Sequence, residues 1–152
     1  MSAVIESNHD DHHHGPAKGF SRWLYTTNHK DIGSMYLWFS LVMLFVGGAM
    51  AMVIRAELFE PGSQIVSPEF YNQMVTNHGL IMVFGVIMPA FVGFANWMIP
   101  MQIGAPDMAL PRLNNLSVWI LPAAFGILLS TFFMEGGAPN FGWTFYAPLS
   151  TE

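Results

Sequence analysis

Three long stretches of this 152-residue chain contain no charged residue, and they constrain the fold more than any other feature. They run from Ile32 to Ile54, from Phe70 to Pro106 and from Leu113 to Met134. Each reaches the roughly 20 residues that an α-helix needs to cross about 30 Å of hydrocarbon at about 1.5 Å per residue. The composition agrees, because 53% hydrophobic and only 10% charged residues is too apolar for a soluble surface. The sequence therefore predicts an all-α integral membrane protein with three transmembrane helices.

The predicted helices cover about 32–54, from near Glu69 to about Gln102, and about 113–134. The second stretch is longer than one span requires, so its helix is expected to tilt or to project past the bilayer. Pro89 and Pro100 predict a kink or a break in it. The chain has no Cys, which excludes disulfides and thiolate metal sites.

Positive charges are distributed unevenly around the predicted helices. Lys18, Arg22 and Lys30 precede the first helix and Arg112 lies between the second and the third, whereas only Arg55 lies on the opposite side. The positive-inside rule then places the N-terminus and the second loop in the cytoplasm, and the first loop and the C-terminal tail outside. Residues 1–19 are polar and read as a flexible cytoplasmic tail, whose HDDHHH cluster is either solvated or a metal site. Residues 20–152 carry the three helices and the outer tail.

A lone histidine, His78, lies about two turns inside the second predicted helix. An imidazole in hydrocarbon is costly unless it has a partner, so this residue is a functional candidate. The helix face that carries His78 has little side-chain volume. At helical spacing the residues on or beside it are Met82, Gly85, Pro89, Gly93 and Asn96. Small residues allow close helix packing, but they also leave room for a flat macrocycle beside an axial ligand. A histidine that bridges helices, a haem ligand and a proton relay all remain open on spacing alone.

Polar residues also gather near the cytoplasmic ends of the second and third helices. Asp107 is the one acid of the second loop, and Asn96 and Asn114 approach the same end. Carboxylate and amide groups at a membrane entrance can organise water and collect protons. Alternatively, Asp107 caps a turn after Pro106 and Asn114 caps the third helix.

The first loop contains several oxygen ligands of the kind that calcium or sodium prefers. A solvated acidic loop is the simpler alternative. The candidate ligands are Glu57, Glu60, the Gly62 carbonyl and Gln64.

Five motifs, in this order and spacing, resemble the first three transmembrane helices of subunit I of the haem-copper terminal oxidases, the cytochrome c oxidase type. They are TTNHKDIG, RAELFEPG, TNHGLIMVFGVIMP, NWMIPMQIGAPDMALPRLNNLSVWILP and GWTFYAPL. The resemblance covers the chain from about residue 20 onward. It implies part of a larger twelve-helix subunit in a bacterial plasma membrane, with other oxidase subunits and membrane lipid as partners and no nucleic acid.

The resemblance implies specific roles for single residues. His78 would be an axial ligand of a low-spin haem of the a type, Arg55 would contact a ring substituent, and Tyr71 and Trp143 would lie near its propionates. Asp107 would be the entrance of a proton-uptake channel of A-type members, with Asn96 and Asn114 lining its first section. The family's outer cation site, calcium or sodium, would fall on Glu57, Glu60, Gly62 and Gln64.

The resemblance further implies a proton-pumping oxidase in which electrons pass from cytochrome c through the low-spin haem to oxygen. A quinol oxidase segment is the alternative, but its branch resembles this chain less, because Val46 and Met50 stand where that branch places charged residues. The other alternative is a three-helix membrane protein of packing or assembly without redox chemistry. No residue here matches the second ligand of the low-spin haem. Nor does any residue match the ligands of the oxygen-reducing haem and copper. We therefore expect a piece of a longer subunit, or a chain that works with a partner, and alone it is catalytically incomplete.

Overall fold

The computed structural model describes residues 19–151, so the HDDHHH cluster lies outside the described part. Within this part every regular element is a helix. Three helical spans are long and apolar enough to cross a membrane, and they are His29–Glu57, Pro68–Ile103 and Pro111–Phe133. The prediction of an all-α membrane fold with three spans is confirmed, and the boundaries differ from the predicted ones by a few residues.

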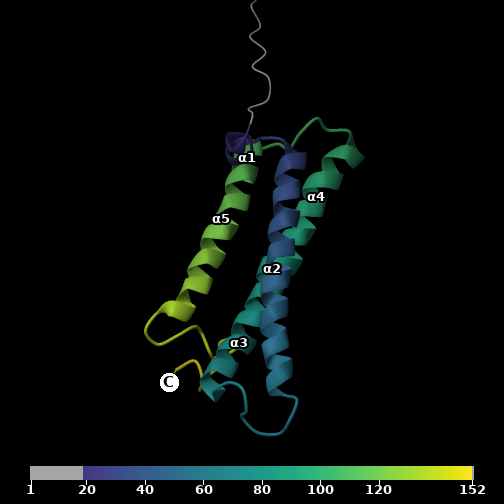
Figure 1. The fold of residues 1–152 in the computed structure, drawn as a ribbon. Coiled ribbons are helices and arrows are strands. Elements are labelled where there is room, and N and C mark those ends of the chain that lie inside the picture. Colours follow the sequence, from purple (N-terminus) through teal and green to yellow (C-terminus); the bar gives the residue numbers. More distant parts are fainter. Residues whose placement is uncertain (1–18, 152) are drawn as a thin grey trace, which may run out of the picture.

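The first span is helix α2 (His29–Glu57), which the short helix α1 (Phe20–Tyr25) precedes. The Asn28 side chain caps α2 by accepting a hydrogen bond of 2.8 Å from the Lys30 N–H. Arg22 of α1 forms an ion pair of 2.8 Å with Asp31 in the first turn of α2. These contacts fix α1 beside the start of α2, at the end of the molecule where α5 also begins (Figure 1).

The second span consists of α3 (Pro68–Leu80), the π-helical segment η1 (Ile81–Ile87) and α4 (Met88–Ile103). Pro89 has no N–H to donate, and the Met88 N–H donates to the carbonyl of Val83, five residues earlier. The predicted irregularity at Pro89 is thus a widened turn. Pro100, by contrast, lies within α4, and the helix ends only where Gly104 adopts a left-handed conformation with φ 69°.

Helix α2 packs along the second span, and glycines set the two places of closest approach. A Cβ added to Gly33 would lie 2.9 Å from the carbonyl oxygen of Gly93 and 2.6 Å from the Trp97 ring. A Cβ added to Gly47 would lie 2.8 Å from the Met82 sulfur. Close helix packing is therefore what the small residues of this face provide.

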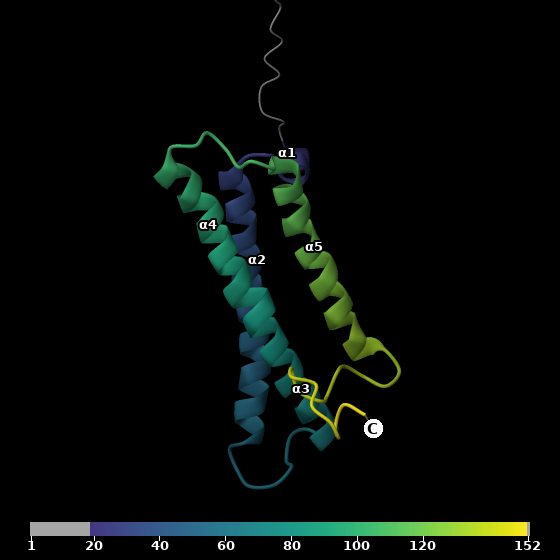
Figure 2. The same ribbon diagram turned by 180° about the vertical axis from the view of Figure 1, so that it is seen from behind.

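The third span is helix α5 (Pro111–Ser130) followed by the 3₁₀ turn η2 (Thr131–Phe133). It packs on α2 through buried Val118 and through Phe125, whose ring meets Phe39 edge-on at 5.5 Å. Toward its C-terminal end α5 diverges from α2 (Figures 1 and 2).

The chain after η2 returns to α3, which Figure 2 shows from behind. The backbone N–H of Gly142 donates to the Thr76 hydroxyl at 2.9 Å, and the buried Asn77 side chain donates to the Pro139 carbonyl at 3.3 Å. This tail therefore covers the part of α3 that carries His78.

Candidate functional site

His78 lies in the last turn of α3, and its ring reaches across to α2. The Nδ1 atom is 2.9 Å from the carbonyl oxygen of Gly47. Since a carbonyl oxygen can only accept, Nδ1 must carry the proton, and the Nε2 atom keeps its lone pair. Imidazoles that bind metals are typically oriented by such a bond at the other ring nitrogen.

The backbone irregularity begins three residues after His78, in η1. Shifting to π-type hydrogen bonds leaves some carbonyls without their usual helical partner. The Ser40 hydroxyl of α2 donates to a carbonyl of this segment, that of Val86, at 2.9 Å. From His78 to η1, α2 therefore holds the second span through one backbone acceptor at His78 and one side-chain donor two turns further along.

Residues near the end of α2 and in the tail surround the His78 end of the molecule. The Trp143 ring packs on Gly79, where an added Cβ would lie 3.6 Å from it. Arg55 is exposed in the last turn of α2, and Tyr71 is half-buried on α3. The structure thus gathers His78, Arg55, Tyr71 and Trp143 at one end, with Trp143 packed beside the residue that follows His78.

At the opposite end a chain of hydrogen bonds joins the second loop to all three spans. Asp107 accepts at Oδ1 from the backbone N–H of His29 at 3.3 Å, and the His29 ring donates from Nδ1 to the Asn96 carbonyl at 2.8 Å. The Asn96 side chain, which is 3% exposed, accepts from the Asn114 amide. Sequence analysis named Asp107, Asn96 and Asn114, and the structure brings the three together.

The hydrogen-bonded chain continues into the membrane-spanning region beyond Asn114. The Asn114 carbonyl accepts from the Ser117 hydroxyl at 2.6 Å, and Ser117 in turn lies 2.6 Å from the hydroxyl of buried Tyr36. His29, Tyr36 and Ser117 were missed in the sequence, although His29 and Tyr36 are seven residues apart and so share a face of α2.

The capping roles considered for Asp107 and Asn114 have different outcomes. Asp107 does bind within its own loop, since its Oδ1 accepts from the Met108 N–H at 2.7 Å. The capping alternative for Asn114 is wrong, because α5 has Leu110 at its N-cap with no side-chain bond. Asn114 lies inside the helix, where its amide is free to face α4.

The acidic first loop is organised around Glu57, which is 6% exposed. Its Oε1 accepts from the Gln64 N–H at 2.8 Å, and its Oε2 accepts from the N–H groups of Ile65 at 2.8 Å and Val66 at 3.0 Å. The Gln64 side chain turns to the Pro61 carbonyl. A cleft of about 510 Å³ beside them is lined by Glu57, Glu60 and Gly62, together with Tyr71. Of the predicted cation ligands, Gln64 alone does not line this cleft.

The comparison with protein families decides what kind of chain this is. A family model described as "Cytochrome C and Quinol oxidase polypeptide I" matches residues 31–152. The chain belongs to this family.

Individual relatives in this oxidase family agree. The chain is 49% identical over 138 residues to a cytochrome c oxidase subunit 1 of Corynebacterium diphtheriae, covering 90% of this chain and 24% of the relative. It is 48% identical over 135 residues to a probable cytochrome c oxidase subunit 1-alpha of Streptomyces coelicolor, covering 89% and 23%. A heme-copper oxidase subunit I+III of Aeropyrum pernix is 47% identical over 131 residues, covering 86% and 16%. The chain thus spans about a quarter or less of these relatives.

Membership in the oxidase polypeptide I family confirms the resemblance seen in the motifs. It also agrees with the three apolar spans, so the chain is the N-terminal portion of an oxidase subunit I and a multi-pass membrane protein. The family model covers both cytochrome c and quinol oxidases, and so leaves the electron donor to be argued from the residues.

Proposed function

We propose that this chain is part of the catalytic subunit of a proton-pumping cytochrome c oxidase, in which it holds one side of a low-spin haem and the entrance of a proton route. The complete subunit would add the second haem, copper and the remaining ligands. The chain would lie in a bacterial plasma membrane with its N-terminus in the cytoplasm. Support comes from family membership and from the separation of the two sites to opposite ends of the helices.

The bond between His78 and Gly47 carries the haem part of the proposal. It fixes the ring across the α2 crossing and leaves Nε2 as a ligand, which fits the nitrogen that haem iron takes from histidine. Arg55 would lie by a ring substituent, and Tyr71 and Trp143 near the propionates. A bound haem would supply one-electron transfer, and these residues would hold and orient it.

The test is His78→Ala in the complete oxidase, with the low-spin haem absorption band as the readout. We expect the band to disappear, because His78 would supply the nitrogen that holds the haem iron on this side. His29→Ala is a matched control, since His29 also donates from Nδ1 to a backbone carbonyl but lies at the other end. An unchanged band in the His78 variant would refute the assignment.

Cytochrome c is the proposed electron donor rather than quinol. The outer half of α2 carries no charge before Arg55, and Met50 there is buried against other apolar side chains rather than available to a polar ligand. Val46 is likewise packed against that cluster. A quinol head group would need charged or hydrogen-bonding partners in this region.

The polar chain at the start of α2 supports a route for proton uptake. Asp107 would collect protons from the cytoplasm, and Asn96 and Asn114 would order the water that leads inward. Ser117 and Tyr36 extend the same line of hydrogen-bonding groups away from Asp107.

The outer cation site is proposed for Glu57, Glu60 and the Gly62 carbonyl, which share one cleft. These oxygens suit a hard cation. Both Glu57 oxygens already accept backbone N–H groups, so its contribution would come through their remaining lone pairs. Gln64 would contribute by holding Glu57 in place.

A further inference from the structure

An apolar surface groove lies between α2 and Trp97 of α4, beginning just after the first turn of α2. Its volume is about 270 Å³, and its lining is almost entirely hydrocarbon. The lining residues are Ser34, Leu37, Trp38, Leu41 and Trp97. Trp38 is 66% exposed and Leu41 is 40% exposed, so the groove is accessible from the outside of this three-helix unit.

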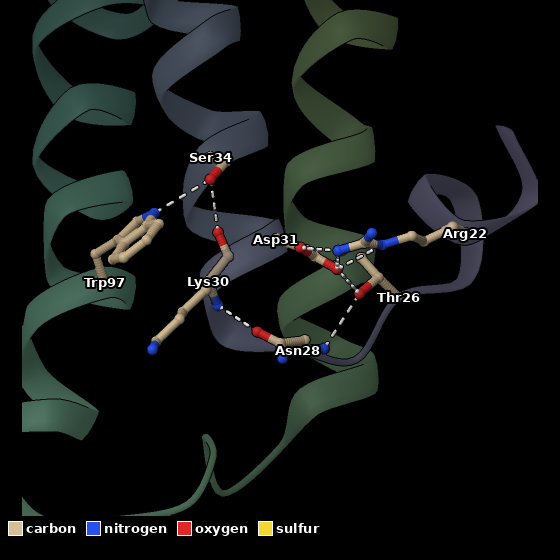
Figure 3. Close-up of polar contacts among 7 residues, drawn as sticks. All are labelled: Arg22, Thr26, Asn28, Lys30, Asp31, Ser34 and Trp97. Atoms are coloured by element: carbon tan, nitrogen blue, oxygen red, sulfur yellow. Dashed lines mark hydrogen bonds and ion pairs between the residues drawn. The ribbon is translucent and has the colours of Figure 1, made fainter. Parts of the chain in front are cut away.

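The wall of the groove is fixed by contacts between the two helices. The Trp97 indole N–H donates to the Ser34 hydroxyl at 3.2 Å, and that hydroxyl donates to the Lys30 carbonyl at 2.8 Å. Below the ring, the close approach of Gly33 to Gly93 leaves no space for it to turn inward. Figure 3 shows the indole lying against Ser34 from the α4 side.

A positive charge stands at the mouth of the groove. The Lys30 ammonium lies 5.7 Å from the centre of the Trp97 ring, within cation–π range. Within residues 19–151 the one ion pair joins Arg22 to Asp31, which neutralises Arg22 and leaves Lys30 without a carboxylate. In Figure 3 Asp31 points toward α1, whereas Lys30 lies on the Trp97 side of α2.

The stretch of α2 from Lys30 to the lower end of the groove at Leu41 matches the depth of one leaflet of a bilayer. From Lys30 to Leu41 the helix rises about 16 Å at about 1.5 Å per residue, which is about half of a 30 Å hydrocarbon layer. A basic side chain and an indole at the headgroup level, above an apolar groove that follows α2 from Ser34 to Leu41, match a phospholipid with an anionic headgroup.

We propose that this groove binds one anionic phospholipid from the leaflet at the start of α2, with its headgroup on Lys30 and an acyl chain along Leu37 and Leu41. The Ser34 hydroxyl is already used, so the charge of Lys30 provides the selection for anionic over neutral lipid. The site is separate from the haem and proton sites and does not depend on their assignment.

The test measures lipid retained by the complete oxidase after exchange into detergent with phosphatidylglycerol or phosphatidylcholine, by native mass spectrometry. We expect one retained phosphatidylglycerol in the wild type and about a five-fold lower occupancy in Lys30→Gln, the effect of one basic residue at a membrane surface. Lys30→Arg should restore it. Arg112→Gln is the matched control, because it removes an exposed positive charge in the first turn of α5, a helix that does not line the groove.

Two further measurements complete the test. Leu41→Trp should fill the lower groove and reduce retention with Lys30 intact. The haem absorption band, recorded for every variant, reports correct folding independently of lipid. Equal retention in Lys30→Gln and the wild type, or equal retention of phosphatidylcholine, would overturn the proposal, as would a photo-crosslinker at Trp38 that captures another subunit instead of lipid.

Discussion

The two ends of the helix pair formed by α2 and the second span hold polar groups in different ways. At the His78 end a single ring bonds to a single backbone carbonyl, that of Gly47. At the other end six residues form a continuous series of hydrogen bonds from Asp107 to Tyr36. The His78 end therefore depends on the geometry of one hydrogen bond, whereas the Asp107 end distributes its function over several groups.

This difference suits the two proposed tasks. A metal ligand must be held at a fixed position, and a rigid helix crossing provides that. A proton route needs a connected set of groups that water can bridge where one is lost. We therefore expect an all-or-none effect when the His78 ring itself is lost and graded effects along the polar chain, except at Asp107, its one acid.

The largest effect on turnover along the chain should come from Asp107→Asn. The amide keeps the size of the side chain and can still accept from the His29 N–H, but it cannot take up and release a proton. In the complete oxidase we expect oxygen consumption to fall by roughly 100-fold, at the low end of what a positioned acid or base contributes. Oxygen-electrode assays measure it.

An unchanged haem spectrum in the Asp107→Asn oxidase is the control for assembly. Normal turnover with normal proton release would show that protons enter elsewhere. Loss of the haem band together with turnover would mean instead that Asp107 acts through the fold, by its bonds to the N–H groups of Met108 and His29.

A smaller effect, on the helix crossing and the haem band, should follow Gly47→Ala at the His78 end. The new Cβ would meet the Met82 sulfur at 2.8 Å and an Ile81 methyl at 3.2 Å, so the helices must separate or Met82 must move. Overpacking of this kind costs about 1–3 kcal/mol. Because the Gly47 carbonyl holds His78, we also expect a shifted or weakened low-spin haem band, which absorption spectroscopy and thermal melts of the purified complex measure.

Gly48→Ala is a matched control for Gly47→Ala, since it makes the same change one residue later, where nothing lies within 4 Å of the added carbon. It should leave the haem band and the melting temperature nearly unchanged. Equal effects of the two substitutions would mean that α2 responds to glycine loss in general, and not to the crossing at Met82.

Much of the fold and part of the site could be read from the sequence, for identifiable reasons. The absence of charge over about 20 residues identifies a membrane span whatever surrounds it, so all three spans were found. The oxygen-bearing residues of the first loop were predicted as a cation site, which stays a prediction, and composition could not show that Glu57 accepts three backbone N–H groups of its own loop. His29 was missed because it lies beside Lys30 and Asp31 in a polar segment, where a histidine looks exposed, whereas the structure leaves it only 5% exposed under Asn96.

The smallest effect should come from Tyr36→Phe, at the inner end of the polar chain. The change removes one hydroxyl, while Ser117 keeps its bond to the Asn114 carbonyl. One neutral hydrogen bond is worth about 1 kcal/mol, and water can take the place of a lost hydroxyl, so turnover should fall by no more than about five-fold.

Ser117→Ala removes the other half of the same contact, and the double variant should be no worse than the slower single one if the pair acts as a unit. A loss as large as that of Asp107→Asn would contradict the view that this end shares its function among several groups. Wild-type turnover in both single variants and in the double variant would place the exit of the proton route before Tyr36.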